Sequence, residues 1–340
     1  MQESELKDRI SPAKLDFNMI TPQQNYPDLA DVVGVSSLYL KREDLHPYGS
    51  HKGRSIPVMI DHYLGQGKRH FAISSSGNAA LAAARHIKKL NGDATSRIIL
   101  EILVGNKITE HKLAKLTDLA DFNVSVMRFE RPLQTLTKKT ADGSIQSLRQ
   151  STDDIALIGY ESLAKELEQI KDLQAVFVAT SSGTTSQALA KYFLKKIEDR
   201  RSKAESLEKQ NSGLGAFDSP FLSANRGLKP VEIHIVQTTS CHPMASEFTD
   251  SIGSEDQSTA DAIVDMTANR KKTLIPLIKK TGGFGWIATN EEIATAQELI
   301  EKHAKIGCSP NGALATAGLM QAVFSGKEWN GSVACVIGGE

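Results

Sequence analysis

The stretch that decides the fold covers residues 38–54 and reads Leu-Tyr-Leu-Lys-Arg-Glu-Asp-Leu-His-Pro-Tyr-Gly-Ser-His-Lys-Gly-Arg. Its first three residues are apolar and predict a short strand, and residues 41–44 are all charged. Residues 47–50 have the composition of a turn that ends in a helix N-cap. Lys52 therefore falls in the first turn of a predicted helix.

Lys52 is an unusual residue at such a position, because the N-terminus of a helix carries partial positive charge and favours anions. One interpretation is that its ammonium simply extends into solvent, as in most lysines. The other is that the helix field and burial favour the neutral amine, which can attack a carbonyl and form a Schiff base. This stretch alone is compatible with both interpretations.

Composition limits the class of protein. A chain of 340 residues is long enough for two domains or lobes, and 40% of it is hydrophobic. Lys and Arg together number 40 and Asp and Glu together number 40, so the formal net charge is zero. We therefore expect neither nucleic acid nor a membrane surface as the main partner.

The three cysteines, Cys241, Cys308 and Cys335, are too widely spaced for a metal motif or a small disulfide framework. We expect free thiols in a reducing compartment, and no metal site. The first residues lack the apolar core of a secretory signal, and no apolar run approaches membrane-spanning length. These features predict a cytoplasmic protein.

Predicted strands alternate with predicted helices along most of the chain, which is typical of βαβ units on a parallel sheet. The run 175–179 is continuously apolar, as in a strand buried on both faces. The predicted strands are 70–73, 98–104, 124–129, 175–179, 231–236 and 332–337. The predicted helices are 52–64, 80–90, 110–120, 161–170, 258–268, 290–306 and 312–324.

Two strand-to-helix junctions are rich in serine, threonine and glycine. Residues 74–78 read Ser-Ser-Ser-Gly-Asn and residues 180–185 read Thr-Ser-Ser-Gly-Thr-Thr. Such junctions direct backbone N–H groups at one point and can hold an anion. The second junction lacks the Gly-Lys-Ser/Thr of a nucleotide-binding loop and suits a phosphate held without a metal, while the first suits a carboxylate. Taken singly, each is equally compatible with plain helix capping.

The order of these segments resembles the fold type II pyridoxal-phosphate-dependent enzymes, the superfamily of the tryptophan synthase β subunit, threonine synthase, serine/threonine dehydratase and cysteine synthase. Residues 41–45 followed by 49–52 resemble the cofactor-lysine motif of these enzymes. The pair His51-Lys52 is similar to tryptophan synthase β, and residues 52–54 are nearer to threonine synthase. Residues 159–162, Gly-Tyr-Glu-Ser, are similar to a Gly-Tyr-Glu-Thr of threonine synthases.

The resemblance covers residues 38–339 and implies an α/β fold. Two open parallel-sheet lobes, with helices on both faces, would enclose a cofactor cleft. The large lobe would comprise residues 1–59 with 141–340 and carry the phosphate loop, and the small lobe, residues 60–140, would carry the carboxylate loop. Residues 196–229 are rich in Lys, Glu, Ser, Asn and Gly, which predicts a mobile insertion. A homodimer is also implied.

The resemblance also implies a role for each matching residue, with pyridoxal 5'-phosphate as the cofactor and an amino acid as the substrate. Lys52 would form the Schiff base with the cofactor and then act as general acid and base at the substrate α-carbon. Asn78 would bind the ring hydroxyl. The substrate carboxylate would be bound by Ser75, Ser76 and Gly77, and the cofactor phosphate by Ser182, Gly183, Thr184 and Thr185.

Ile337 departs from the pattern of this family, in which a Ser, Thr or Cys at the end of the last core strand faces the pyridine nitrogen. Ile337 offers no hydrogen bond, and Cys335, two residues earlier on the same strand face, offers only a weak thiol contact. This departure leaves catalytic competence open. His51, the neighbour of Lys52, is expected to pack rather than to catalyse.

Three hypotheses about function follow. The first is a lyase that performs β- or γ-elimination or replacement on an amino acid, threonine synthase-like, with a serine/threonine dehydratase-like ammonia-lyase as the alternative member. The second is a cofactor- or amino-acid-binding homologue with impaired catalysis. The third, a doubly wound protein that binds an unrelated phosphorylated metabolite, requires Lys52 to point into solvent.

Overall fold

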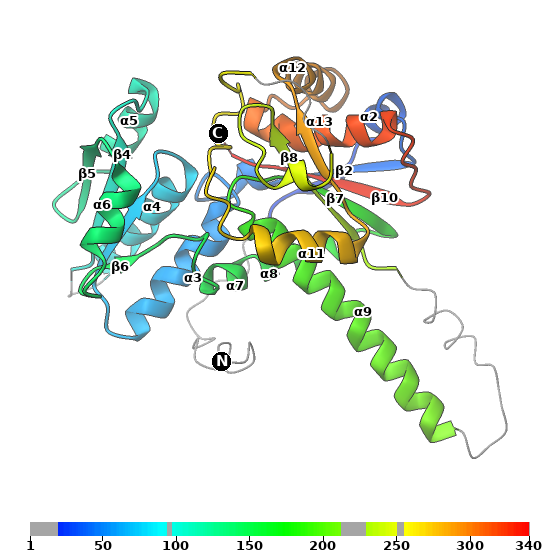
Figure 1. The fold of residues 1–340 in the computed structure, drawn as a ribbon, viewed down its shortest axis with the longest axis horizontal. Helices are drawn as coiled ribbons and strands as arrows, with labels where there is room; N and C mark the ends of the chain where they lie inside the picture. The colour runs from blue at the N-terminus through cyan, green and yellow to red at the C-terminus, as the bar shows by residue number, and fades with distance from the viewer. Residues whose placement is uncertain (1–19, 94–96, 212–228, 250–254, 340) are drawn as a thin grey trace.

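The chain forms two separate β-sheets with helices packed around them (Figure 1). The computed structural model describes residues 20–93, 97–211, 229–249 and 255–339. Six strands form the larger sheet, in the order β1-β2-β10-β7-β8-β9, and four form the smaller one, in the order β5-β4-β3-β6. Among the strands named in the described residues, every pairing is parallel except that of β1 with β2.

The strands of the larger sheet are β1 (Gln23–Asn25), β2 (Ser37–Arg42), β7 (Leu173–Ala179), β8 (Glu232–Thr238), β9 (Gly285–Ala288) and β10 (Ser332–Ile337). The central strands are buried on both faces, because helices cover both. On one face lie α2 (Pro27–Val33), α12 (Asn290–Leu299) and α13 (Pro310–Phe324). On the other lie α8 (Glu161–Leu167), α9 (Thr184–Asn211) and α11 (Lys271–Thr281).

The smaller sheet consists of β3 (His70–Ser74), β4 (Ile99–Gly105), β5 (Val124–Phe129) and the short β6 (Gln146–Ser147). The helices on one of its faces include α4 (Asn78–Asp93) and α5 (Glu110–Thr117), and α6 (Pro132–Lys139) covers the other. Helix α3 (Lys52–Gly65) starts at the larger sheet and packs, together with α7 (Ile155–Gly159), against the core of the smaller one. Figure 1 shows α3 between the two sheets.

The carboxyl ends of three neighbouring strands meet at one edge of the larger sheet. Ile337 at the end of β10 pairs with Arg42 at the end of β2, and Val336 pairs with Val178 near the end of β7. Because these strands are parallel, the segments that follow them emerge side by side. They are the turn before Lys52, the glycines that follow β10 and the loop 180–185.

Helix α9 occupies the first part of the predicted insertion, residues 196–229. It continues to Asn211 and extends away from the body of the molecule (Figure 1). Residues 212–228 lie outside the described residues. Within the described part of the chain, no helix combines the length and the apolar character that crossing a membrane requires.

Candidate active site

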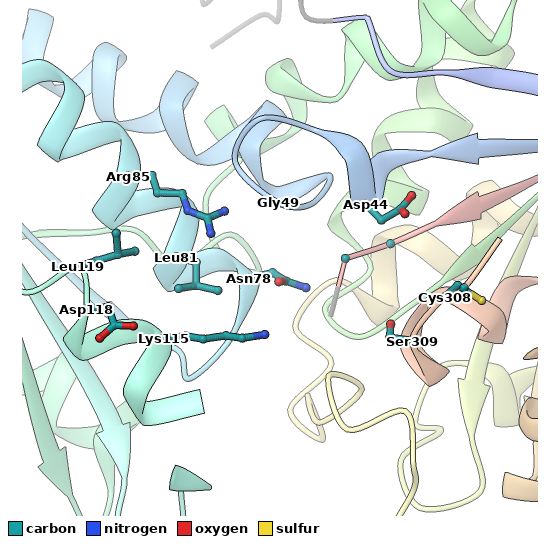
Figure 2. Close-up of a pocket in the computed structure, with 13 residues that line it drawn as sticks. Asp44, Gly49, Asn78, Leu81, Arg85, Lys115, Asp118, Leu119, Cys308 and Ser309 are labelled. Atoms are coloured by element: carbon teal, nitrogen blue, oxygen red, sulfur yellow. The ribbon is translucent and has the colours of Figure 1, made fainter. Parts of the chain in front are cut away.

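A cavity of about 510 Å³ lies between the two sheets (Figure 2). This volume suits a cofactor or a drug-sized ligand. From the side of the larger sheet it is lined by Asp44, Gly49, Gly307, Cys308, Ser309, Gly338 and Gly339. From the side of the smaller sheet it is lined by Asn78, Leu81, Arg85, Lys115, Asp118 and Leu119.

The turn before Lys52 forms one wall of this cavity. Gly49 has a φ of +85°, a left-handed conformation that favours glycine. The hydroxyl of Ser50 accepts a hydrogen bond from the backbone N–H of Lys52, at 3.3 Å. Lys52 is the first residue of α3 and is half-buried. Its ammonium donates to no acceptor among the described residues, so the amine is available to a ligand.

His51 lies between Lys52 and the end of β10. Its ring lies near that of Tyr160, with ring centroids 6.0 Å apart, and its Nδ1 is buried without a partner in the described part of the chain. A Cβ on Gly338 would lie 3.6 Å from that nitrogen. Burial above all, and then the charge of Lys52, hold the pKa of His51 well below its ordinary value. The ring is therefore neutral at pH 7 and presents one unused polar atom beside a glycine of the cavity wall.

A buried ionic network holds the residues on both sides of the lysine turn in place. The guanidinium of Arg54 donates to Glu43, at 2.7 Å, and to Glu166, at 2.6 Å. The ammonium of Lys41 also donates to Glu166. Lys41, Glu43 and Arg54 are almost completely buried, and their charges are compensated within this network, which includes Glu166. The network joins β2, α3 and α8 and sets the direction in which α3 starts.

A second polar chain joins the lysine turn to α4. The hydroxyl of Tyr48 lies 2.9 Å from Nδ1 of His86, and Nε2 of His86 lies 2.9 Å from a carboxylate oxygen of Asp61. Tyr48 belongs to the turn, Asp61 to α3 and His86 to α4. The three side chains therefore hold the turn and both helices in one arrangement.

The loop 75–77 follows β3 and leads into α4. The hydroxyl of Ser75 accepts a hydrogen bond from the backbone N–H of Gly77, at 3.3 Å, and the carbonyl of Gly77 accepts from Ala80 and Leu81. The loop is half-buried, and its free N–H groups lie at the N-terminus of a 16-residue helix. The side chain of Asn78, the first residue of that helix, points into the cavity (Figure 2). A carboxylate is the natural ligand of such a loop.

The loop 180–185 follows β7 and leads into α9. Gly183 has a φ of +78°, and a Cβ there would lie 2.8 Å from Cδ2 of Leu274, so only glycine fits. Ser181 anchors the loop, since its hydroxyl accepts hydrogen bonds from Val264 and Asp265, at 3.2 and 3.3 Å. The backbone N–H groups of residues 182–185 donate to no acceptor in the described ranges. Together with the adjacent hydroxyls of residues 182 and 184, they form a donor set for a dianion at a helix N-terminus.

Comparison with known proteins identifies the family. A family model described as "Pyridoxal-phosphate dependent enzyme" matches residues 15–339. The chain belongs to this family. Its cofactor is pyridoxal 5'-phosphate, as the sequence predicts, and its two helix-covered parallel sheets are the expected fold type II architecture.

Relatives of this pyridoxal-phosphate-dependent enzyme include a threonine synthase and a serine dehydratase-like protein. Threonine synthase from Methanosarcina acetivorans is 24% identical over 317 residues, which are 90% of this chain and 70% of the relative. A human serine dehydratase-like protein is 38% identical over 79 residues, which are only 23% of this chain and 24% of the relative. The similarity therefore extends over most of the chain in the first case and is local in the second.

Solved structures share the fold at low sequence identity. Threonine deaminase isoform 2 from Solanum lycopersicum has a TM-score of 0.69 and 18% identity, covering 100% of this chain and 90% of that one. Maize serine racemase has a TM-score of 0.69 and 16% identity, covering 99% of this chain and 91% of that one. At such identities the comparison shows the fold alone.

The residues of this enzyme fit the cofactor. The uncharged donor set of the loop 180–185 matches the chemistry of a phosphate, and the amine of Lys52 matches that of an aldehyde. The unpartnered Nδ1 of His51 and the amide of Asn78 offer further polar contacts around the same edge of the larger sheet. We infer that Lys52, Asn78 and residues 182–185 hold the cofactor.

The end of β10 presents only apolar surface and thiols that stay protonated. Ile337 is completely buried in the core beneath α13, and a Cβ on Gly312 would lie 3.2 Å from its Cγ2. Burial raises the pKa of the Cys335 thiol to about 12. Burial likewise raises the pKa of Cys308, in the cavity wall, to about 11. No thiolate is therefore present at neutral pH at either cysteine.

The cavity contains one of the residues that the sequence predicts for the site, Asn78. Lys52 and the predicted residues 75–77 and 182–185 are not among the lining residues of this cavity; Gly49, three residues before Lys52, and Asn78, directly after residue 77, are. The lining residues that sequence reasoning did not assign to the site include Leu81, Arg85, Lys115, Asp118, Leu119, Gly307, Cys308 and Ser309. A signal for two of them exists, because Leu81 and Arg85 follow Asn78 at the helical spacing i, i+3 and i+7.

Proposed function

We propose that this enzyme catalyses β- or γ-elimination or replacement on an amino acid, with threonine synthase-like chemistry on a phosphorylated hydroxy-amino acid as the leading candidate. The observation that carries the proposal is the place of Lys52. It starts α3 beside the cavity, at the same sheet edge as the loop 180–185, and its ammonium has no partner among the described residues. The similarity to a threonine synthase over 90% of the chain supports the leading candidate.

Each part of the site then has a task. The bound cofactor supplies an electron sink for charge that develops at the substrate α-carbon. Lys52 carries the cofactor, removes the proton from the α-carbon and returns a proton to the product or leaving group. Residues 75–77 hold the substrate carboxylate, Asn78 the ring hydroxyl and residues 182–185 the phosphate. Because the donors are preformed by their helices, they orient the ligand at little entropic cost.

Two alternatives have specific support. A serine/threonine dehydratase-like ammonia-lyase is supported by the local similarity to the human serine dehydratase-like protein. A binding protein with impaired catalysis is supported by Ile337, whose buried apolar side chain offers nothing to the cofactor ring.

The test uses purified protein loaded with pyridoxal 5'-phosphate. We expect a yellow protein whose colour is lost in Lys52→Ala but kept in Lys89→Ala, which removes an exposed lysine of α4. Borohydride reduction followed by peptide mass spectrometry should find the cofactor mass on the peptide that contains Lys52. A colourless wild-type protein, or label on another lysine, would remove the proposal.

A substrate panel separates the candidates. Phosphate release from O-phosphohomoserine supports the threonine synthase-like reaction, and keto acid formation from serine or threonine supports the dehydratase. Stable cofactor binding without any product favours the impaired homologue.

The proposal also covers the lobes of the enzyme, its compartment and its oligomeric state. We propose a large lobe of residues 1–59 with 141–340, which contains the larger sheet, and a small lobe of residues 60–140, which contains β3, β4 and β5; the short β6 of the smaller sheet follows the small lobe in sequence. The three free thiols favour a reducing compartment such as the cytoplasm. We expect a homodimer. Light scattering during size-exclusion chromatography measures the molar mass and tests this expectation.

A further inference from the structure

Helix α4 turns one face toward the cavity. Asn78, Leu81 and Arg85 lie at positions i, i+3 and i+7 of this helix, and all three line the cavity (Figure 2). Seven residues of helix correspond to about 10 Å along its axis. Arg85 therefore stands about two turns beyond the loop that we assign to the substrate carboxylate.

The guanidinium of Arg85 reaches back over the lysine turn. Its Nη1 would lie 2.5 Å from a Cβ placed on Gly49, three residues before Lys52. Long side chains of a helix lean toward its N-terminus, which directs this charge toward Asn78 and the middle of the cavity. The glycine at position 49 leaves the space that the guanidinium occupies.

Arg85 differs from the buried arginines of the structure in having no carboxylate partner among the described residues. Arg54 is paired with Glu43, at 2.7 Å, and Arg270 with Asp154, also at 2.7 Å. Those two arginines stabilise the fold through their ion pairs. Arg85 is half-buried in a cavity wall with its charge uncompensated by an ion pair in the described ranges, which is costly unless an anion binds there.

The remaining charges of the cavity do not cancel that of Arg85. Lys115 of α5 also lines the cavity, and Figure 2 shows its side chain extending toward the side on which Asn78 lies. Asp118 is exposed at the rim. Asp44, on the opposite wall, is paired with Arg42 at 2.7 Å. The wall formed by the smaller sheet thus carries two cations and one exposed anion.

We propose that Arg85 binds an anionic group at the far end of the substrate side chain, so that the enzyme selects amino acids with a phosphorylated or carboxylate-bearing side chain. This inference rests on the proposed function, which places the substrate carboxylate at residues 75–77. Between the two anion sites, Leu81 offers an apolar surface to the methylene groups of the side chain. A guanidinium suits both anions, because it donates two parallel hydrogen bonds to either.

The test compares matched ligand pairs on the cofactor-loaded enzyme. O-phospho-L-serine is compared with L-serine, and L-aspartate with L-asparagine, by titrating the absorbance of the bound cofactor. The wild-type enzyme should bind at least one anionic member more tightly than its neutral partner. The pair that shows this preference tells whether the anion is a phosphate or a carboxylate.

Three variants locate the preference. Arg85→Gln should weaken binding of the preferred anionic ligand about 10- to 100-fold and leave the neutral partner unchanged. Arg85→Lys keeps the positive charge but loses the paired donors of the guanidinium. Its affinity for the anionic ligand should therefore lie between those of Arg85→Gln and the wild type. Lys89→Gln removes an exposed positive charge one turn further along the same helix. It should leave the affinity for both members of each ligand pair unchanged.

The inference is overturned if the wild-type enzyme prefers neither anionic ligand, or if Arg85→Gln weakens both members of a pair equally. Its failure is distinguishable from failure of the proposed function. An Arg85-dependent preference without any product would contradict the proposed lyase activity alone. Turnover with unchanged selectivity in Arg85→Gln would contradict the role of Arg85 alone.

Discussion

Gly339 lies directly against the carbonyl oxygen of Gly49: a Cβ at position 339 would stand 2.2 Å from that oxygen. The backbone after the last strand and the turn before Lys52 are therefore in direct contact. The contact follows from the strand order, because β2 and β10 are parallel neighbours whose carboxyl ends align. The shape of the turn at Gly49, and with it the cavity wall before Lys52, thus depends on a residue 290 positions further along the sequence.

Gly339→Ala should disturb the lysine turn. The new methyl group would overlap the Gly49 carbonyl, and relieving such an overlap typically costs about 1–3 kcal/mol. We expect the affinity for pyridoxal 5'-phosphate, measured by absorbance titration, to fall at least tenfold. Gly307→Ala is the matched control, since Gly307 also lines the cavity and a Cβ there meets no atom within 4 Å. Equal cofactor affinity in both variants would contradict the prediction.

Arg54→Leu should destabilise the whole protein. Removal of the guanidinium leaves Glu43 completely buried without its charged partner, and breaking a buried pair in this way costs about 3–5 kcal/mol. Urea denaturation measures the loss of unfolding free energy. Lys280→Met, which breaks a well-exposed pair with Glu198, should cost at most about 1 kcal/mol. A similar loss in the two variants would show that the buried network does not stabilise the fold.

The stability of the protein should fall in acid partly because of Glu166. Burial alone would raise the pKa of this carboxyl, but hydrogen bonds and charge from Arg54 and Lys41 outweigh it and lower the pKa below the ordinary value of 4.5. The carboxylate therefore contributes stability above pH 4.5, and this contribution is lost as the pH falls through the lowered value. Urea midpoints at pH 7, 5, 4 and 3 should fall less steeply in Glu166→Gln than in the wild type. Glu198→Gln, which removes an exposed carboxylate, is the control for the loss of a charge as such.

Ile337→Thr should test the departure at the end of β10. The buried hydroxyl should destabilise the protein by about 1–3 kcal/mol, and it places a polar side chain directly before Gly338, which lines the cavity. We expect a shift in the absorbance of the bound cofactor or a change in turnover. Val333→Thr places the same hydroxyl on the same strand face, four residues earlier and equally buried, and should lower stability without either effect. Indistinguishable cofactor spectra in the two variants would show that Ile337 does not influence the cofactor.

Local sequence patterns predicted much of the secondary structure. The strands 124–129 and 332–337 form as predicted, because continuous or alternating apolar residues leave few other arrangements. The predicted helix 258–268 is wrong, since those residues are irregular. Their backbone N–H groups are satisfied by distant side chains instead: Asn290 accepts from Thr259, at 2.8 Å, and Ser181 accepts from Val264, at 3.2 Å. Such tertiary partners are invisible in a local pattern.

The site was predictable only where its chemistry is local. Lys52 and Asn78 each belong to a recognisable strand-to-helix junction, and Asn78 does line the cavity. Nothing in the local pattern of the charged residues 41–44 indicates burial, yet Lys41 is completely buried. Its partner Glu166 is 125 positions away, so no local pattern could reveal the pair. Cys308 and Ser309, on the opposite wall, are also far from Lys52 and Asn78 in the sequence, so no local pattern could reveal their place in the cavity.

The contact between Gly49 and Gly339 has a consequence for biogenesis. A nascent chain that has emerged only as far as the smaller sheet contains Lys52, to which we propose the cofactor binds, but lacks Gly339, which contacts the turn before this lysine. Contacts of such long sequence separation form late in folding. Capture of the coenzyme therefore reports that the last strand has been inserted between β2 and β7, and truncated or misassembled chains should emerge colourless.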